Sequence, residues 1–392
     1  MTTAAAERIV VVGNGVAGLT ACDSLRASGF DGELTIVGDE QHPPYSRPAL
    51  SKALLRNDAD TMAHRLPEPT HQANEILGVS ASGLNVERQI LHLDDGTDLP
   101  YDRLVIATGS RARRLGGSAT GADSGELTLR RLEDAHRLRR LLLERPSVVV
   151  VGGGPLGMEI ASACVAAGCD VTLISDTEPL RPHLGAHLSA LFLNAAVEHG
   201  VRVITTGSAR VTDHAGACAV VTPDGDVFEP DLVVTAAGDI PNVEWLADSG
   251  LLTGKQLQVD SRGRLRPDIV AVGDVAAFPT GRGVRRVPLW SSAVEQAKVA
   301  ASALLFGDGA PELHYQPYFW TEQFGLSLKA CGELPAHGDP VVERSEPGGS
   351  MLLRWMHEDG SGTAAAINHR IAIPMLRRLA SQPPAAVPAA SS

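Results

Sequence analysis

The stretch "RIVVVGNGVAGLT", residues 8–20, decides the fold of the first part of this chain. Four apolar residues precede a turn whose glycines are Gly13, Gly15 and Gly18. In a dinucleotide-binding βαβ unit, such glycines permit a tight turn, a close approach of the backbone to a pyrophosphate, and close packing of the next helix on its strand. The apolar run "ELTIVGD", residues 33–39, then predicts the second strand of the unit.

The same pattern returns in "SVVVVGGGPLGMEI", residues 147–160, where Gly152, Gly154 and Gly157 have the same spacing. The run "DVTLISD", residues 170–176, again predicts a second strand. One G-x-G-x-x-G is a weak signal, but two copies that each lie between an apolar strand and a helical pattern are specific. We therefore predict an α/β protein with two Rossmann-like domains, which bind one resident and one exchangeable dinucleotide.

Composition limits the alternatives. With 392 residues and 44% hydrophobic content, the chain is long enough for two or three domains. A net charge of −12 gives no general attraction for nucleic acid or anionic lipid, and no apolar run reaches the ~18 residues of a membrane span. Because the N-terminus also has no signal-peptide pattern, we expect a cytoplasmic protein without nucleic-acid or membrane partners.

The five cysteines are scattered and none forms C-x-x-C, so we expect reduced structural thiols and assign no metal site. Cys164 and Cys169 have a C-x4-C spacing, but they lie within and just after the second predicted nucleotide helix. We interpret both as packing residues.

A carboxylate after the second strand of such a unit accepts hydrogen bonds from ribose hydroxyls. Asp39 and Glu40 stand there in the first unit, whereas in the second the strand ends on Ser175 and Asp176 follows. Asp176 would repel a 2′-phosphate, while Arg181 and His183 could receive one. The sequence thus favours NADH and leaves NADPH possible.

Several longer segments resemble one family. "RLVIATGSRARRL" (103–115), "VTAAGDIPN" (234–242) and "IVAVGDVAAF" (269–278) are similar to the two-domain flavoprotein reductases. "PPYSRPALSK" (43–52), "LRRLEDA" (129–135), "WSSAVEQA" (290–297) and "PYFWTEQF" (317–324) resemble, within these, the ferredoxin, rubredoxin and putidaredoxin reductases that serve oxygenases. The resemblance implies a glutathione-reductase-like fold with a small α+β C-terminal domain.

It also implies domain boundaries. A FAD-binding domain would comprise residues 1–112 and 242–312, with an NAD(P)H-binding domain of residues 113–241 inserted and a C-terminal domain of residues 313–392. The ending "SQPPAAVPAASS", from about residue 381, reads as a disordered tail by composition.

The resemblance assigns cofactor-binding residues. Those for FAD are Gly13, Gly15, Ala17, Gly18, Asp39, Arg47, Lys52, Val79, Thr108, Gly109, Arg130, Asp274 and Trp290. Those for the nicotinamide nucleotide are Gly152, Gly154, Gly157, Ser175, Asp176 and Gly238. Arg130 could equally be an ordinary helix-surface arginine. Ser292 and Glu295 form an S-x-x-E capping box, which predicts that a helix begins at Ser292.

Lys52, Glu159 and Trp320 are the candidate catalytic residues. The resemblance places Lys52 beside flavin N5 and Trp320 at the flavin edge, and an ion pair between Lys52 and Glu159 would stabilise charge that arrives on the reduced ring. Two alternatives stay open. Lys52 could be a solvated surface lysine, and Glu159, expected in the first helical turn, could complement the helix dipole.

The predicted function is a FAD-dependent NAD(P)H reductase. It would pass electrons singly to a ferredoxin or rubredoxin-like protein that serves an oxygenase or a cytochrome P450. Arginine clusters at Arg111, Arg113 and Arg114, and at Arg282, Arg285 and Arg286, could dock that acceptor or could simply be solvated. A small-molecule NADH reductase of the monodehydroascorbate or quinone type and a redox-sensing interaction protein are the alternatives. The protein would be a monomer or a homodimer.

Overall fold

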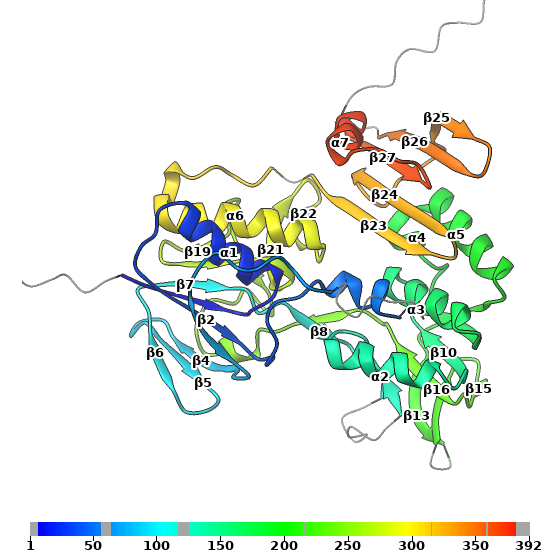
Figure 1. Cartoon of the computed structure of the whole chain (residues 1–392), viewed down its shortest axis with the longest axis horizontal. Helices are drawn as coiled ribbons and strands as arrows, with labels where there is room; N and C mark the ends of the chain where they lie inside the picture. The colour runs from blue at the N-terminus through cyan, green and yellow to red at the C-terminus, as the bar shows by residue number, and fades with distance from the viewer. Residues whose placement is uncertain are drawn as a thin grey trace, which may run out of the picture. The chain divides into compact units, whose positions relative to one another are not determined.

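A computed structural model describes residues 7–55, 64–116, 125–214, 217–314, 316–357 and 360–381 (Figure 1). The chain divides into two compact units. Unit 1 comprises Met1–Pro48, His64–Arg111 and Asp239–Tyr315, and unit 2 comprises Ala49–Ala63, Ala112–Gly238 and Gln316–Ser392. The three-domain boundaries expected from the sequence stay a prediction, and the expected tail lies outside the described residues except at Ser381, which ends a helix.

Unit 1 is built on a six-stranded sheet in the order β19-β20-β7-β1-β2-β3, parallel except where β19 meets β20. The strands are β1 (Arg8–Val12), β2 (Glu33–Gly38), β3 (Asn74–Leu77), β7 (Arg103–Ile106), β19 (Arg264–Arg266) and β20 (Ile269–Ala271). Helices α1 (Val16–Ala27) and α6 (Trp290–Phe306) lie side by side on one face (Figure 1).

The apolar run of β1 is buried on both faces of this sheet. Ile9 and Val11 belong to the core beneath α1 and α6, whereas Val10 and Val12 belong to the core on the opposite face. Successive side chains of a strand point to opposite sides, so a strand covered on both faces must be apolar at every position. The second core also contains residues of an antiparallel sheet of β4 (Ala81–Asn85), β5 (Ile90–Leu93) and β6 (Asp98–Pro100).

Unit 1 is completed by short elements. The strands are β8 (Ser110–Ala112) paired with β17 (Asp239–Pro241), and a sheet of β18 (Leu257–Gln258), β21 (Ala276–Thr280) and β22 (Gly283–Arg286). Single 3₁₀ turns are Arg47–Ala49, which crosses into unit 2, Glu244–Leu246, Gly273–Val275 and Gly307–Gly309.

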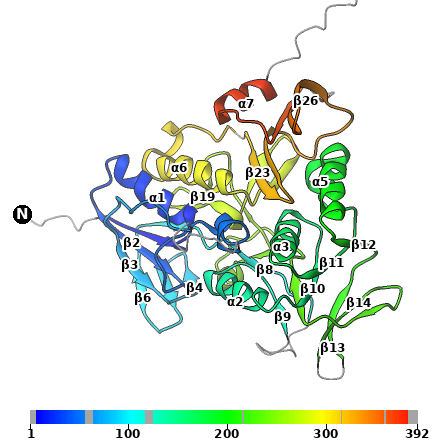
Figure 2. The ribbon, with the colours of Figure 1, turned by 45° about the vertical axis from the view of Figure 1, so that its right-hand side comes forward.

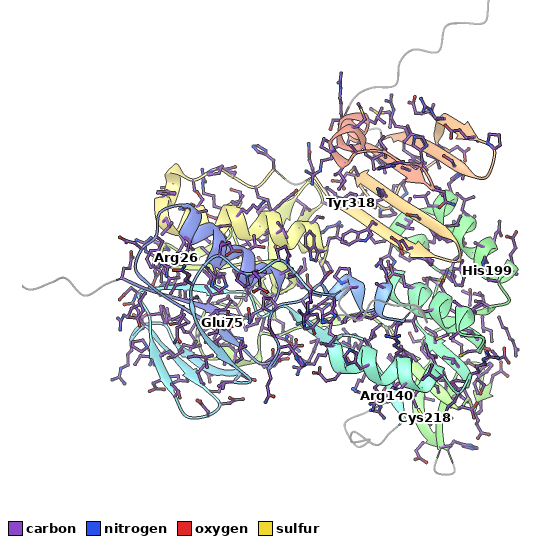
Figure 3. The ribbon with its side chains drawn as sticks, viewed as in Figure 1. Arg26, Glu75, Arg140, His199, Cys218 and Tyr318 are labelled. Carbon is purple, nitrogen blue, oxygen red and sulfur yellow. The ribbon has the colours of Figure 1, made fainter. Side chains whose placement is uncertain are left out.

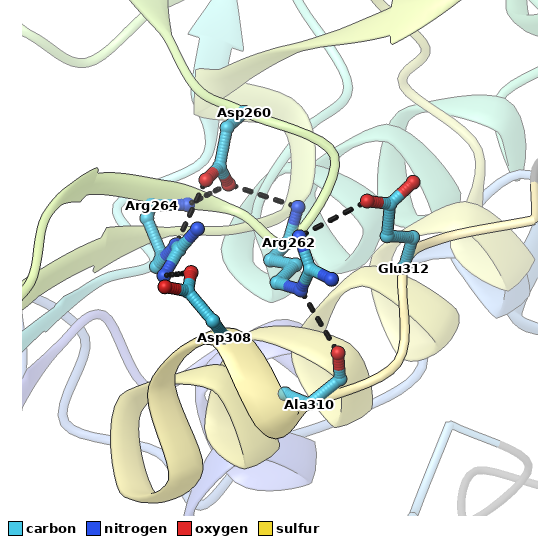
Figure 4. A network of polar contacts seen from close by, with 6 residues as sticks. All are labelled: Asp260, Arg262, Arg264, Asp308, Ala310 and Glu312. Carbon is cyan, nitrogen blue, oxygen red and sulfur yellow. Dashed lines mark hydrogen bonds and ion pairs between the residues drawn. The ribbon is translucent and has the colours of Figure 1, made fainter.

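A polar network joins the turn before β19 to the segment after α6 (Figure 4). Asp260 Oδ1 accepts hydrogen bonds from the backbone N–H groups of Arg262 and Arg264, both at 2.9 Å, and its Oδ2 accepts one from Arg264 Nε at 2.8 Å. Arg264 also pairs with Asp308 at 2.8 Å, and Arg262 donates to the carbonyl of Ala310. Burial raises the pKa of Asp260, but these hydrogen bonds outweigh it and lower the pKa overall.

Unit 2 contains the second parallel sheet, in the order β12-β11-β10-β16-β9. Its strands are β9 (Glu126–Leu127), β10 (Ser147–Val151), β11 (Asp170–Ser175), β12 (Arg202–Thr205) and β16 (Leu232–Thr235). The helices are α2 (Leu132–Leu142), α3 (Pro155–Ala166), α4 (Arg181–Leu184) and α5 (Ala186–Glu198). An antiparallel sheet of β13 (Arg210–His214), β14 (Ala217–Val221) and β15 (Val227–Phe228) shares a hydrophobic core with the parallel strands, and β13 and β14 are seen at the lower right of Figure 2.

The C-terminal part of unit 2 is an antiparallel sheet in the order β23-β24-β27-β26-β25, with one helix packed against it. Its elements are β23 (Tyr318–Gln323), β24 (Leu326–Gly332), β25 (Val341–Glu346), β26 (Ser350–Met356), β27 (Gly362–Ile367) and α7 (Ile373–Ser381). A further 3₁₀ turn, Ala53–Leu55, also belongs to unit 2. Strand β23, which includes Tyr318 and Trp320, contacts helix α3, the helix after the second glycine turn.

None of the helices in the described part of the chain is long and apolar enough to cross a membrane.

Candidate functional site

The first glycine turn joins β1 to α1 and leaves open space at the helix N-terminus. Gly13 has φ +114°, and a Cβ there would lie 2.2 Å from the carbonyl oxygen of Ala107. A Cβ on Gly18 would lie 1.9 Å from the oxygen of Gly13, whereas one on Gly15 would meet no atom within 4 Å. Gly13 and Gly18 are therefore required by the protein itself, and Gly15 leaves room in front of the N–H groups of α1, as a pyrophosphate needs.

The second turn, between β10 and α3, repeats this arrangement. Gly152 has φ +118°, and a Cβ there would lie 2.3 Å from Ala236 O. A Cβ on Gly157 would clash with Gly152 O at 1.9 Å, while one on Gly154 would only make ordinary contact with the ring of His183 at 3.5 Å. Gly238 has φ +92° with no atom within 4 Å of its Cβ position. Both units thus have the packing expected from the sequence.

The residue between the first two glycines distinguishes the two turns. In unit 1 it is Asn14, whose Cβ lies 2.8 Å from the Cβ position of Gly38 at the end of β2. In unit 2 it is Gly153, whose Cβ position lies 2.4 Å from Ser175 Oγ at the end of β11. Each pair has room for one side chain. In unit 1 the side chain belongs to the turn residue, Asn14, and in unit 2 it belongs to the strand residue, Ser175.

Asn14 is a candidate ligand that the sequence analysis missed. Its Oδ1 and Nδ2 are both buried and have no hydrogen-bond partner within the described part of the chain. Orphaned buried polar atoms carry a desolvation cost that a bound polar group would remove. Together with the open space at Gly15, this fits a dinucleotide in the first turn. The signal in the sequence was the side-chain amide at a position where the second turn has glycine.

The carboxylates after β2 have different surroundings. Asp39 is exposed, as a ribose ligand must be before binding. Glu40 forms an ion pair with Arg47 at 2.5 Å and accepts a hydrogen bond from Tyr45 Oη at 2.6 Å. Arg47, which we expected to bind cofactor, is therefore held by Glu40 in this structure.

Other expected FAD residues lie near the carboxyl ends of the parallel strands of unit 1. Thr108 follows β7, and its hydroxyl donates to Asn242 O at 2.9 Å, while Asn242 Nδ2 donates back to Thr108 O. Gly109 has φ +62°. Val79 donates its N–H to Gly38 O, next to the first turn.

Helix α6 begins earlier than expected. Leu289 is the N-cap residue, and Trp290 and Ser291 are already helical. Ser292 is buried inside the helix and its hydroxyl makes no capping hydrogen bond, so the predicted capping box is wrong. The extended conformation of Leu289, with φ −116° and ψ 140°, starts the helix directly after it. Gln296 of this helix accepts a 2.7 Å hydrogen bond from the N–H of Gly273, next to Asp274, which is half-buried.

Ala17 and Arg130 also occupy defined positions. Ala17 is buried, and its Cβ lies 3.0 Å from the Cβ position of Gly273. Arg130 precedes α2 and its N–H donates to Asp134 at 2.9 Å. Since Arg130 lies before the helix and is half-buried, the alternative of an ordinary helix-surface arginine is not supported.

The residues after β11 disfavour a 2′-phosphate. Asp176 is exposed there, and Arg181 is held by Glu178 at 2.7 Å. The hydrogen bond from Arg181, followed by one from Ser189 Oγ, lowers the pKa of Glu178. Burial lowers the pKa of His183, which disfavours the charged form of its imidazole.

The buried acidic residue of α3 is the centre of the candidate catalytic site. Lys52 Nζ lies 2.8 Å from Glu159 Oε1, and the two side chains are 12% and 5% exposed. Thr321 Oγ1 donates to the same Oε1 at 2.6 Å, and Ser51 Oγ donates to Oε2. Glu159 is the fifth residue of α3 and so lies in the second turn, not the first. The ion pair expected from the sequence is present, and the alternatives of a solvated lysine and a dipole-complementing acid are excluded.

The ring of Trp320 lies close to the ammonium of Lys52. Its ammonium lies 5.7 Å from the ring centroid of Trp320, within the range of a cation–π contact. Trp320 stacks on Tyr318, labelled in Figure 3, with ring centroids 5.6 Å apart. Phe324, by contrast, is 4% exposed and belongs to the core.

The cysteines and arginines agree only in part with expectation. All five cysteines are free. Cys164 and Cys169 are buried, as the interpretation of both as packing residues requires, and burial raises the pKa of each thiol. Cys218, labelled in Figure 3, is partly exposed on β14. Arginines with structural roles are Arg111, paired with Glu244 at 2.5 Å, Arg114, bonded to Glu126 O, and Arg286, paired with Asp239 at 2.7 Å. The docking role of the arginine clusters stays a prediction.

Comparisons with known proteins agree with this geometry. Residues 7–297 match the family model described as pyridine nucleotide-disulphide oxidoreductase. The chain belongs to this family. It is 37% identical to rhodocoxin reductase of Rhodococcus erythropolis over 86% of this chain and 80% of that one. It is 35% identical to putidaredoxin reductase of Pseudomonas putida over 86% of this chain and 83% of that relative.

Solved structures lead to the same conclusion. The chain matches putidaredoxin reductase in its covalent complex with putidaredoxin at a TM-score of 0.85 and 30% identity, over 96% of this chain and 94% of that chain. The predicted fold class is confirmed, with two dinucleotide-binding domains of the family type. The family's cofactors are FAD and NAD(H), and its members are oxidoreductases.

Proposed function

We propose that this chain is a FAD-dependent ferredoxin–NAD(+) reductase that takes electrons from NADH and passes them singly to a small iron–sulfur protein. The observation that carries the proposal is the buried Lys52–Glu159 pair under Trp320 in a chain that also has two dinucleotide turns. Relatives with similar sequences are named as ferredoxin–NAD(+) reductase components of the p-cumate and benzene dioxygenase systems.

We assign the two turns to different nucleotides. Residues 1–112 and 242–312 would form the FAD domain, in which Gly15, Asn14 and Asp39 bind the adenylate half. Residues 113–241 would form the NADH domain, in which Gly154 and Asp176 bind the nicotinamide nucleotide. Residues 313–392 would form the third domain and contribute Trp320.

Bound FAD would supply the chemistry, since a flavin accepts a hydride from a nicotinamide and can release electrons one at a time. The side chains of this protein would set the conditions for it. Lys52 stabilises negative charge through its ammonium, and Glu159 holds that ammonium in a fixed place. Trp320, whose ring centroid lies 5.7 Å from the ammonium, would shield it from water on one side and would be the exit point for electrons.

The reductant in this proposal is NADH. Three features support it: Asp176 is exposed after β11, Arg181 is held by Glu178, and burial lowers the pKa of His183. A 2′-phosphate would face the carboxylate of Asp176, while the nearby Arg181 is already paired with Glu178.

The electron acceptor is proposed to be a [2Fe–2S] ferredoxin of an oxygenase or cytochrome P450 system, with a rubredoxin as the alternative. All five thiols are free, and no cysteine lies between Cys22 and Cys164, so a disulfide-reductase mechanism has no redox pair to use. The oligomeric state and the cytoplasmic location stay predictions.

The test is reduction of cytochrome c by NADH with the purified, FAD-loaded protein, with and without an added [2Fe–2S] ferredoxin. Strong stimulation by the ferredoxin is expected. Lack of stimulation by any ferredoxin or rubredoxin, combined with fast turnover of a quinone or radical acceptor, would instead support a small-molecule reductase. Slow flavin reduction without turnover of any acceptor would support a redox sensor.

A further inference from the structure

The carboxylate of Glu159 is held by more than its lysine partner. Ser51 and Lys52 are neighbours in the chain and donate to different oxygens of the same carboxylate, Oε2 and Oε1. Thr321 from β23 donates to Oε1 at 2.6 Å. Glu159 and Thr321 are 5% and 0% exposed, so water supplies none of the bonds that Thr321 makes.

The proton of the Thr321 hydroxyl has a defined direction. Gln323 Nε2 donates to Thr321 Oγ1 at 2.9 Å, which occupies an acceptor position of that hydroxyl. The hydroxyl proton is then free to point at Glu159 Oε1. Thr321 and Gln323 are two residues apart on β23 and so lie on the same face of the strand, whereas Trp320 points to the other face. Strand β23 thus contacts both members of the ion pair, through Thr321 at the acid and Trp320 at the amine.

A buried ion pair needs such bonds. The mutual attraction of two buried charges offsets their desolvation only when the geometry is good and the remaining lone pairs are satisfied. A lysine side chain also has several rotatable bonds, so its ammonium stays in one place only if its partner does. Hydrogen bonds that fix the carboxylate therefore fix the position of the ammonium.

We propose that Ser51 and Thr321, with Gln323 behind Thr321, are positioning residues that hold Glu159 so that Lys52 stays in place for hydride transfer. This deepens the proposed function and rests on it. Because both hydroxyls act through Glu159, their contribution should disappear when Glu159 cannot accept in the same way.

The first experiment compares Thr321→Val, Thr321→Ser and wild type in anaerobic stopped-flow reduction of the FAD-loaded protein by NADH. Thr321→Val keeps the shape and loses the hydroxyl, and we expect the limiting rate to fall about 10-fold while the NADH dissociation constant changes by less than about twofold. Thr321→Ser should restore the rate to within about twofold of wild type. Thr363→Val is the matched control, since Thr363 is a buried threonine of the same sheet whose hydroxyl donates to Glu333 O.

The second experiment is a double-mutant cycle with Glu159→Gln. The loss caused by Thr321→Val should shrink to less than about twofold in that background. Ser51→Ala provides an independent variant should Thr321→Val not fold, as judged by its melting temperature and FAD content. Ser51→Ala is expected to slow reduction in the wild-type background only.

A third readout does not depend on turnover. The midpoint potential of the bound flavin, measured against a reference dye, should become more negative in Thr321→Val and return in Thr321→Ser, because a less ordered ammonium stabilises negative charge less well. The proposal is overturned by a wild-type rate and potential in Thr321→Val, by a Thr321→Ser variant as slow as Thr321→Val, or by an equal loss in the Glu159→Gln background. If NADH does not reduce the wild-type flavin at all, the proposed function has failed instead, and the potentials still test the positioning role.

Discussion

The ammonium of Lys52 lies 2.8 Å from Oε1 of Glu159. The two residues are far apart in the chain, since Lys52 precedes every strand of the parallel sheet of unit 2 and Glu159 lies in α3, after the glycine turn of that sheet. Both side chains are largely shielded from water, so neither charge is present for solubility. A buried lysine–glutamate pair is costly to desolvate, and charge stabilisation during a reaction is one reason for a protein to keep it. The contribution of Lys52 to such a reaction can be tested directly.

Replacing Lys52 by methionine removes the charge and keeps most of the side chain's length. We expect Lys52→Met to slow flavin reduction by NADH about 10- to 1,000-fold, because a preorganised charge contributes a few kcal/mol to such a step. Stopped-flow bleaching of the flavin measures the rate. Lys255→Met, at an exposed lysine in a turn of unit 1, is the control and should match wild type. An unchanged rate in Lys52→Met would remove this residue from the mechanism.

The middle glycines of the two turns provide a paired test of which unit binds which nucleotide. Gly15→Ala and Gly154→Ala introduce no clash within the protein, so both variants should fold normally. Gly15→Ala should purify with little FAD, because its methyl group occupies the space for the pyrophosphate. Gly154→Ala should retain FAD and show an NADH dissociation constant at least about 10-fold higher. FAD content by absorbance and NADH titration distinguish them, and the reverse pattern would exchange the two assignments.

Asn14 should contribute to cofactor affinity and not to the stability of the protein without cofactor. Removing a buried amide that has no partner relieves a desolvation cost, so Asn14→Ala should leave the melting temperature of the apoprotein unchanged or higher. FAD binding, followed by quenching of flavin fluorescence, should weaken about 10-fold. Equal FAD affinity in both proteins would show that Asn14 does not contact the cofactor.

Coenzyme preference depends on the ion pair that holds Arg181. We expect wild type to have a higher kcat/KM with NADH than with NADPH. Glu178→Gln should release Arg181 and raise kcat/KM for NADPH severalfold, with little effect on NADH. Glu178→Gln combined with Arg181→Ala should lose that gain. A wild-type preference for NADPH would contradict the prediction.

Acid should weaken the Asp260 network in Figure 4. The pKa of Asp260 is lowered in the folded protein, so this carboxylate contributes stability above its unfolded pKa of about 3.9, and the contribution is lost as the pH falls through the lower folded value. Asp260→Asn should cost about 1 kcal/mol at pH 7, since the group is partly exposed. The difference from wild type in urea unfolding should shrink toward pH 3. A difference independent of pH would mean that the charge is not involved.

Local patterns were sufficient for the two βαβ units. A strand buried on both faces requires a run of apolar residues, and the positive φ of Gly13 and Gly152 requires glycine. Both features therefore depend only on residues that are adjacent in the sequence. The strands at residues 33–38 and 170–175 and the helices after each turn follow from the same local signals. The sequence also favours reduced, structural thiols, because no C-x-x-C occurs and no cysteine lies in the segment between Cys22 and Cys164.

Only the tertiary structure decided which polar groups meet. The residues near Glu159 in the chain do not predict that Ser51 and Thr321 donate hydrogen bonds to it. Likewise, Ser292 of the predicted capping box lies inside α6, which begins at Trp290. The sequence left Arg286 open as either a docking or a solvated residue, whereas in the fold it forms an ion pair with Asp239. The physical reason is that backbone conformation depends on neighbours in the chain, whereas the partner of a side chain depends on which distant elements pack against it and in which register.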